Sequence, residues 1–469
     1  MNPGRLLFPA LRWDSESGFR HEAETIADGL ELGVGGFILF GGEFDAVADL
    51  TTDLVARAGR PLLIASDLER GAGQQITGLT DVPPPGALGA LADPDAIRAA
   101  ARLTALEARR VGVNWILAPD GDLDLLPENP IVQTRSFGDD PARVAGAVAA
   151  WVGACQATGT PACAKHYPGH GRTAVDSHAV LPVVEAPAEV LRGSDEVPFR
   201  AAIVAGVAAI MTAHVAFPAL DPSGAPATFS HLILQRLRDR LGFEGAVVTD
   251  ALIMEAARGA GPGPAAVAAL RAGCDLLLYP PDVRACHVAL TEALQDGSLP
   301  EGRVEAALAR YAGLLGRVEG PPRDDAPDAA WAAGVGRRLL ALPPGRGTLP
   351  RLRPPVRIEV VDDDRGGPYP PRPDVGLERL LEGRVPLGPG GSRIVCAFNE
   401  PRGWKGRSGF SPEARSRLAA RCPDADLVVL FGHPRLVDGL PGQAPVLVAW
   451  HRQLLMQIAV AEWIVERLG

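Results

Sequence analysis

The sequence predicts a (β/α)8 TIM-like barrel followed by a smaller α/β domain. Two observations predict the barrel: short, nearly continuous apolar runs recur from residue 6 to residue 280, and longer segments rich in Ala, Leu and Arg separate most of them. Apolar strands joined by helical crossovers form a parallel sheet covered on both faces, and eight such units fit a closed barrel. The strand candidates are "LLFPAL" (6–11), "GFILFG" (36–41), "LLIASD" (62–67), "NWILAP" (114–119), "ACAKHYP" (162–168), "AAIMTAHV" (208–215), "GAVVTD" (245–250) and "CDLLLYP" (274–280).

A change in composition separates this segment from the rest of the chain. The stretch "GRVEGPPRDDAPDAA" (316–330) is rich in Pro, Gly and charged residues, which is typical of a linker. We therefore expect a barrel over residues 1–318, a linker with a short helix over 319–355, and a C-terminal α/β domain over 356–469. The acidic stretch "DDDRGG" (362–367) has the composition of an acidic metal loop, but we expect it to be a solvated turn. Strand candidates of the last domain are 356–363, 392–398, 426–432 and 445–450, with a final helix candidate at 454–468.

Composition and charge exclude several classes of protein. Of the 469 residues 47% are hydrophobic and 22% charged, which are ordinary values for a soluble globular protein. The net charge of −10 argues against nucleic acid as a partner, because nucleic-acid-binding proteins usually show a basic face. No signal peptide and no long apolar run is recognisable, so we expect a cytoplasmic protein with no membrane partner. The six cysteines form no C-x-x-C pair, which favours buried free thiols over a zinc site.

Titratable residues recur at the ends of the strand candidates. In a barrel of this kind, the active site is built where strands end and the loops to the helices begin. Polar loops alone would explain one or two of these residues but not the repetition. Lys165 is one of only two lysines in the chain, which indicates that its position needs a compact ammonium group. The strand-end residues are Asp67, Asp120, Asp122, Asp124, Lys165, His166, His214 and Asp250.

The stretch "KHYPGHGRTAVDSH" (165–178) concentrates three histidines, a lysine and an aspartate. A metal site is disfavoured, because Pro168 and Gly169 interrupt the helix that would place His166 and His170 on one face. The chain also lacks the G-x-S-x-G elbow of serine hydrolases and a Walker phosphate-binding motif.

Proton transfer fits the end of this stretch better. Asp176 and His178 stand two positions apart, and an aspartate that accepts from one imidazole nitrogen leaves the other to give or take a proton. Asp250, at a strand end, is placed to attack an electrophilic carbon in the barrel mouth. A carboxylate nucleophile with a separate acid/base is the machinery of retaining glycoside hydrolysis, in which the usual acid is a second carboxylate.

The motifs resemble those of glycoside hydrolase family 3, and most of all its bacterial β-N-acetylglucosaminidases. The resemblance runs from about residue 36 to residue 280 and rests on "SDLERGAG", "NPIVQTRSFG", "AKHYPGHGRTAVDSH" and "GFEGAVVTDALIM". It implies that Asp250 is the nucleophile, His178 the general acid/base and Asp176 its partner. The residues that it implies for sugar binding are Asp67, Arg135, Lys165 and His166; His214 lies near the mouth as a further sugar contact or a supporting residue.

The sequence departs from the family pattern at two places. The stretch "DLERGAGQQ" stands where D-Q-E-G-G-R-V-x-R is common, so Arg70 is shifted and the last arginine is replaced near Gln75. Ala251 stands where a second aspartate usually follows the nucleophile. The contacts around these two positions are therefore open.

The resemblance implies a retaining glycosidase that removes terminal β-linked N-acetylglucosamine (N-acetylhexosamine) through a covalent glycosyl-aspartate. The implied partner is a small carbohydrate, with no metal and no organic cofactor, and a role in cell-wall recycling is an expectation of the same kind. Three alternatives remain: a β-N-acetylglucosaminide phosphorylase, in which phosphate replaces water; a family 3 β-glucosidase or xylosidase; and a sugar-binding protein without turnover. The natural glycoside, the role of the C-terminal domain and the oligomeric state stay open at this point.

Overall fold

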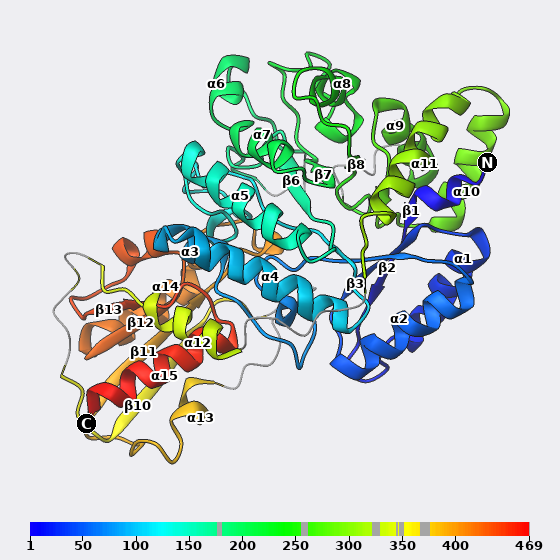
Figure 1. The fold of residues 1–469 in the computed structure, drawn as a ribbon. Coiled ribbons are helices and arrows are strands. Elements are labelled where there is room, and N and C mark those ends of the chain that lie inside the picture. The colour runs from blue at the N-terminus through cyan, green and yellow to red at the C-terminus, as the bar shows by residue number, and fades with distance from the viewer. Residues whose placement is uncertain are drawn as a thin grey trace.

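The computed structural model describes residues 1–175, 181–254, 261–320, 329–343, 346, 351–365 and 376–468. Within them, the strands of the barrel follow one another along the chain with helices between (Figure 1). Pro9 splits the first predicted strand in two, because proline has no N–H to donate to the sheet. The barrel strands are β1 (Leu7–Phe8), β2 (Ala10–Arg12), β3 (Gly36–Phe40), β4 (Leu63–Ser66), β5 (Trp115–Ile116), β6 (Cys163–Tyr167), β7 (Ala209–Thr212), β8 (Ala246–Val248) and β9 (Leu277–Leu278).

Parallel pairing runs once around these strands. One sheet has the order β2-β3-β4-β5, a second has β6-β7-β8, and β1 pairs with β9. A parallel bridge between Ile116 and Ala162 joins the first sheet to the second, and another between Val248 and Leu276 joins β8 to the segment before β9. The strands therefore form the (β/α)8 barrel that the sequence predicts, with β1 and β2 counted as one strand.

Helices cover the outside of the barrel. The segment before β5 shows why they form: Asp93 accepts hydrogen bonds from the N–H groups of Asp95 and Ala96, and Pro94 occupies the first helical position. A side-chain cap of this kind stabilises a helix by about 1 kcal/mol. The barrel helices are α1 (Ala23–Leu32), α2 (Phe44–Ala58), α3 (Pro85–Leu91), α4 (Pro94–Arg110), α5 (Pro141–Gln156), α6 (Ala188–Gly193), α7 (Val197–Val204), α8 (His231–Asp239), α9 (Pro262–Ala272), α10 (Val283–Gln295) and α11 (Glu301–Leu315).

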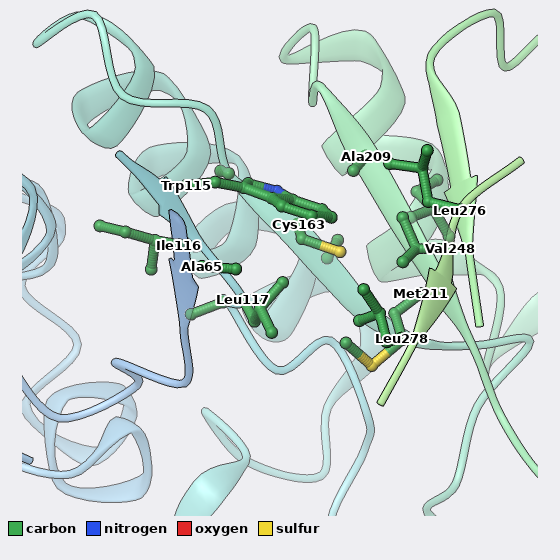
Figure 2. Close-up of a cluster of buried hydrophobic side chains, with 14 of the residues drawn as sticks. Ala65, Trp115, Ile116, Leu117, Cys163, Ala209, Met211, Val248, Leu276 and Leu278 are labelled. Atoms are coloured by element: carbon green, nitrogen blue, oxygen red, sulfur yellow. The ribbon is translucent and has the colours of Figure 1, made fainter. Parts of the chain in front are cut away.

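Apolar side chains fill the inside of the barrel. Figure 2 shows Trp115, Cys163, Met211 and Leu278 packed together between strands from opposite parts of the ring. The indole of Trp115 is fully buried and meets the ring of Phe8 edge to face, with 5.5 Å between ring centroids. A filled interior leaves the ends of the strands as the place where polar chemistry is exposed. All six cysteines are free and buried, as the sequence predicts.

A second parallel sheet with the order β10-β11-β12-β13 forms the core of the C-terminal domain. Residues that alternate along the strands pack on opposite faces, so that one face meets α13 and α15 and the other meets α14. Figure 1 shows this domain beside α3 and α4 of the barrel. Of the helices described, none combines the length and the apolar composition that crossing a bilayer requires. The elements are α12 (Ala329–Arg338), β10 (Val356–Asp362), α13 (Leu377–Leu381), β11 (Ser392–Asn399), α14 (Pro412–Arg421), β12 (Leu427–Gly432), β13 (Val446–Val448) and α15 (Leu454–Leu468).

The acidic stretch at the end of β10 is buried, and the expectation of a solvated turn is wrong for its first three residues. The Lys405 ammonium pairs with the Asp364 carboxylate, and Arg452 Nη1 lies 3.1 Å from Asp362 Oδ1 and 3.2 Å from Asp364 Oδ2. Cations supplied from distant parts of the chain compensate the cost of removing these carboxylates from water.

Candidate active site

The carboxyl ends of β4, β5 and β6 bring a cluster of charged residues together. Lys165, inside β6, reaches Asp67 with 2.5 Å between Nζ and Oδ1, and reaches Glu69 with 2.8 Å between Nζ and Oε1. Glu69 also binds Arg135 through two contacts, 2.9 Å from Nε to Oε2 and 2.8 Å from Nη2 to Oε1. Glu69 therefore bridges two residues that the sequence predicts for sugar binding, and sequence reasoning assigned it no role.

Burial and pairing set the charge states of this cluster. Burial opposes ionisation of Glu69, but Arg135 and Lys165 outweigh it and hold the pKa of Glu69 well below its usual range. Burial likewise opposes the charged form of Lys165, while Asp67 and Glu69 raise the pKa of Lys165. Near neutral pH both groups are therefore ionised. Asp67 is the most open member of the set, with 26% of its side chain exposed, so its carboxylate is available to a bound molecule.

The segment after β5 holds the histidine of β6 in place. Asp122 Oδ2 lies 2.8 Å from His166 Nδ1, and its Oδ1 accepts from the backbone N–H of His170 at 2.6 Å. Burial opposes the charge of Asp122, but His166 outweighs it and keeps the pKa of Asp122 below the ordinary value. Burial lowers the pKa of His170 to about 4, so that His170 is neutral at pH 7. The contact at Nδ1 fixes the ring of His166 and leaves Nε2 as its second hydrogen-bonding atom.

Asp250 follows β8 and is connected to His214 through one residue. The Ala251 N–H donates to Asp250 Oδ1 at 2.7 Å, and the Ala251 carbonyl lies 3.2 Å from His214 Nε2. The other ring nitrogen of His214 is 2.8 Å from Thr228 Oγ1, and the His214 side chain is fully buried. In this arrangement, His214 supports the loop that carries Asp250.

The structure thus brings six of the sequence-predicted residues to one end of the barrel, five of them in two groups and His166 beside the first group. Lys165, Asp67 and Arg135 belong to the first group and contact one another directly or through Glu69. Asp250 and His214 form the second group. His166, beside Lys165 in β6, is held by Asp122. Asp176 and His178 lie outside the described residues.

Residues 14–314 match the model of the glycosyl hydrolase family 3 N-terminal domain. The chain belongs to glycosyl hydrolase family 3. This family 3 chain is 34% identical over 401 residues to a β-N-acetylglucosaminidase/β-glucosidase of Cellulomonas fimi, an alignment that covers 80% of the chain and 70% of the relative. It is 41% identical over 257 residues to a β-hexosaminidase of Alkalilimnicola ehrlichii, covering 52% of the chain and 73% of that relative.

Solved structures agree with the assignment. A family 3 β-N-acetylglucosaminidase from Paenibacillus sp. str. FPU-7 matches with a TM-score of 0.87 and 28% identity, over 100% of this chain and 96% of that one. A β-N-acetylhexosaminidase from Beutenbergia cavernae matches with a TM-score of 0.61 and 28% identity, and 67% of this chain covers 97% of it. The chain is therefore a glycoside hydrolase with the barrel fold of its family.

Three residues of the family 3 site have the donor set of a possible cation site. Donor atoms of Asp120, Asp122 and His166 all lie within 4.8 Å of one another, and all three residues are buried. Burial and the neighbouring Asp122 raise the pKa of Asp120, so this carboxyl group resists ionisation. A metal ion here would also have to replace the hydrogen bond that fixes the imidazole of His166. Asp122 is engaged in positioning His166, and Asp120 Oδ1 accepts from the Asp122 N–H at 2.8 Å.

One cavity in the described part of the enzyme lies away from this cluster. It measures about 800 Å³ and is lined by residues at the amino ends of the strands, including Pro61, Leu62 and Asn114, and by Leu308 and Tyr311 of α11. Its walls are mainly apolar, and no cluster of ion pairs faces it among the lining residues. In a barrel enzyme, chemistry takes place at the carboxyl ends of the strands, so the charged cluster there is the better candidate for the active site.

Proposed function

We propose that this family 3 enzyme removes terminal, non-reducing β-linked N-acetylhexosamine, with N-acetylglucosamine as the sugar, and retains the anomeric configuration. The observation that carries the proposal is the group of Asp67, Lys165, Arg135 and His166 at the same barrel end as Asp250. Ammonium, guanidinium and carboxylate groups fixed by one another give a rigid array of donors and acceptors for sugar hydroxyls. The names of the relatives support the aminosugar as substrate.

The reaction proceeds through two displacements at the anomeric carbon. An Asp250 oxygen attacks this carbon while its bond to the glycosidic oxygen breaks, and His178 gives a proton to the departing oxygen. A water molecule then attacks the same carbon, its proton goes to His178, and the bond to Asp250 breaks. Asp176 orients the imidazole of His178. The roles of His178 and Asp176 rest on the resemblance of "KHYPGHGRTAVDSH" to the family motif.

The residues around the nucleophile have supporting parts. The Ala251 N–H that donates to Asp250 Oδ1 orients the carboxylate for attack. His214 holds the Ala251 carbonyl and thereby the orientation of this loop, which is why we assign it a supporting role instead of a direct sugar contact. We assign residues 1–318 to the catalytic unit. The mechanism that we propose uses neither a metal ion nor an organic cofactor.

A turnover assay tests the proposal. Wild type, His178→Ala and Asp250→Ala are given the nitrophenyl β-glycosides of N-acetylglucosamine and glucose, with the exposed-site variants His21→Ala and Asp239→Ala as matched controls. We expect cleavage of the acetylated sugar by wild type and both controls. Asp250→Ala should lose more activity than His178→Ala, because nitrophenolate needs little help from an acid, but His178→Ala should still slow the second step, in which His178 takes the proton of water. General acid–base help is worth about 10²–10⁴-fold.

Adding azide to Asp250→Ala tests directly whether Asp250 is the nucleophile. Without the carboxylate, azide can attack the anomeric carbon directly and give a glycosyl azide of inverted configuration, whereas a residue with a supporting role gives no such product. Preference for the glucoside, or full activity of His178→Ala, would refute the proposed function.

Phosphorolysis is the second candidate function. A neutral imidazole does not repel an incoming phosphate as a carboxylate base would. If phosphate accelerates turnover and sugar 1-phosphate replaces the free sugar, the enzyme is a phosphorylase.

We further propose a cytoplasmic location and a role in the turnover of cell-wall sugars. Cell fractionation and an assay on muropeptide fragments test these two statements separately.

A further inference from the structure

The carboxyl edge of the C-terminal sheet lies against the loops that carry the sugar-binding side of the barrel site. Gln453, after β13, donates from Nε2 to the Val82 carbonyl at 2.6 Å. The backbone carbonyl of Ser408, after β11, accepts from Gln133 Nε2 at 3.4 Å. Arg435, after β12, pairs with Asp124. These contacts reach the loops after β4 and β5, which also carry Asp67 and Arg135.

The turn after β12 aims two side chains at one carboxylate of the barrel. His433 caps the 3-10 helix Pro434–Gly439, and its Nδ1 accepts from the Arg435 N–H at 3.2 Å. In the neutral imidazole the proton then sits on Nε2, which is 3.0 Å from Asp124 Oδ2. The Arg435 guanidinium binds the same oxygen through Nη2, and its Nη1 donates to the Leu126 carbonyl at 3.3 Å.

Asp124 is almost inaccessible to solvent, with 9% of the residue exposed. Its other oxygen, Oδ1, has no hydrogen-bond partner among the described residues. His433 and Arg435 therefore provide the side-chain partners of this carboxylate, and both come from the C-terminal domain.

The segment that carries Asp124 is bonded both to the residues that follow Arg135 and to His166. The Asp124 N–H donates to the Gly138 carbonyl at 2.9 Å, and the Asp122 carbonyl accepts from Ser136 Oγ at 2.6 Å. Residues 136–138 directly follow Arg135. On its other side, the same segment carries Asp122, which binds His166. A shift at Asp124 is thus transmitted to Arg135 and to His166.

We propose that Arg435, assisted by His433, is a positioning residue for the sugar-binding side of the barrel site. Its ion pair with Asp124 fixes the loop after β5, and this loop fixes His166 and Arg135. The C-terminal domain then acts on sugar affinity without touching the reacting atoms. This inference rests on the proposed function, because it concerns the same site.

One solved relative matches only part of this chain. Two thirds of this chain cover 97% of the Beutenbergia cavernae protein, so that protein has little counterpart of the remaining third. We therefore expect the effect of removing Arg435 to fall mainly on binding.

The test compares Arg435→Met with Arg338→Met in the full chain. Arg338, at the end of α12, makes an Arg–Asp ion pair with the barrel, 3.1 Å from Nη2 to Asp93 Oδ2, but 57% of its side chain is exposed. We expect kcat/KM of Arg435→Met for the nitrophenyl N-acetylglucosaminide to fall by about 10- to 100-fold, with most of the loss in KM, as is common when a residue behind a binding group is removed. Arg338→Met should keep the wild-type values.

A double-mutant cycle with Asp124→Asn separates positioning from general damage. Asp124→Asn removes the buried negative charge that Arg435 compensates. The KM of the double variant Asp124→Asn/Arg435→Met should therefore be much closer to the wild-type value than the KM of Arg435→Met. Arg435→Lys should retain more affinity than Arg435→Met.

Wild-type kinetics of Arg435→Met, equal losses in Arg435→Met and Arg338→Met, or additive effects in the cycle would overturn the proposal. The binding of free N-acetylglucosamine, measured by titration calorimetry, gives the same comparison without turnover. If the wild type binds the sugar but cleaves no glycoside, the proposed function is refuted. The positioning role of Arg435 is then tested by the calorimetric affinities of wild type, Arg435→Met and Arg338→Met alone.

Discussion

Replacing Glu69 with glutamine should destabilise the barrel more than any other single loss of charge at the site. Glu69 lies 2.8 Å from Lys165 Nζ and makes two contacts, of 2.8 and 2.9 Å, with Arg135. Its side chain is 3% exposed, so its charge compensates two cations that water cannot reach well. Removing one partner of a buried ion pair costs about 3–5 kcal/mol, and Asp67 remains to compensate Lys165 in part. We therefore expect Glu69→Gln to lower the free energy of unfolding by an amount near the lower end of this range.

The matched control is Glu359→Gln. Glu359, on the strand β10, binds Arg393 through two contacts of 2.9 Å and also pairs with Arg357 and Arg421, and its side chain is 11% exposed against 3% for Glu69. Exposed pairs contribute about 0–1 kcal/mol. Urea unfolding followed by circular dichroism, at pH 7 and fixed salt, measures both variants against wild type. If Glu69→Gln lowers the free energy of unfolding by less than about 1 kcal/mol, the ion pairs of Glu69 contribute no more than exposed pairs do. The conclusion that burial makes these pairs important to stability would then be refuted.

The pH dependence provides a second check. Because the folded pKa of Glu69 is depressed, the stability that it contributes is fully present above the pKa of an unfolded glutamate and is lost as the pH falls through the folded pKa. The difference between wild type and Glu69→Gln should therefore be constant from about pH 5 to pH 8 and shrink below about pH 4. A difference that stays unchanged on further acidification, as far as the protein remains folded, would mean that Glu69 acts through its shape and not through its charge.

Two further predictions follow from the packing and the charges around the site. A Cβ at Gly171 would lie 1.9 Å from the Leu123 carbonyl, so Gly171→Ala should lower both the melting temperature and kcat/KM, whereas Gly146→Ala, in α5 with no atom near, should raise stability by about 0.5–1 kcal/mol. Equal melting temperatures of the two variants would contradict this. His170 and His451 both have a pKa of about 4, so the unfolded chain binds protons more readily and unfolding becomes easier as the pH falls from about 6.5 to 4. Urea midpoints over this range should fall for wild type and fall less for His451→Gln.

The sequence was sufficient to predict the barrel and much of the site, because parallel strands bring their carboxyl ends to one edge. That rule alone locates Asp67, Lys165 and Asp250, and the side chains are found there. Glu69 was missed because its partner Arg135 stands 66 positions away, and a lone glutamate in a loop carries no local sign of a bridging role.

The same limit explains what was missed in the C-terminal domain. The acidic stretch after β10 suggested a solvated turn, since local polarity is all that a short window of sequence displays. Its burial depends on Lys405 and Arg452, which lie 41 and 88 positions from Asp364. The contact of Arg435 with Asp124 spans 311 positions and depends on how two domains pack, which no periodicity encodes.

The two lysines of the chain, Lys165 and Lys405, are both buried and paired with aspartates. Every other basic side chain except histidine is an arginine, so the folded surface carries guanidinium groups and no lysine amine. Glycoside hydrolysis releases reducing sugars, and their aldehyde form condenses with free amines far more readily than with amines held in ion pairs. A surface without lysine amines is thus poorly suited to glycation by the product. Amine-directed crosslinkers should likewise find no side-chain target until the protein unfolds.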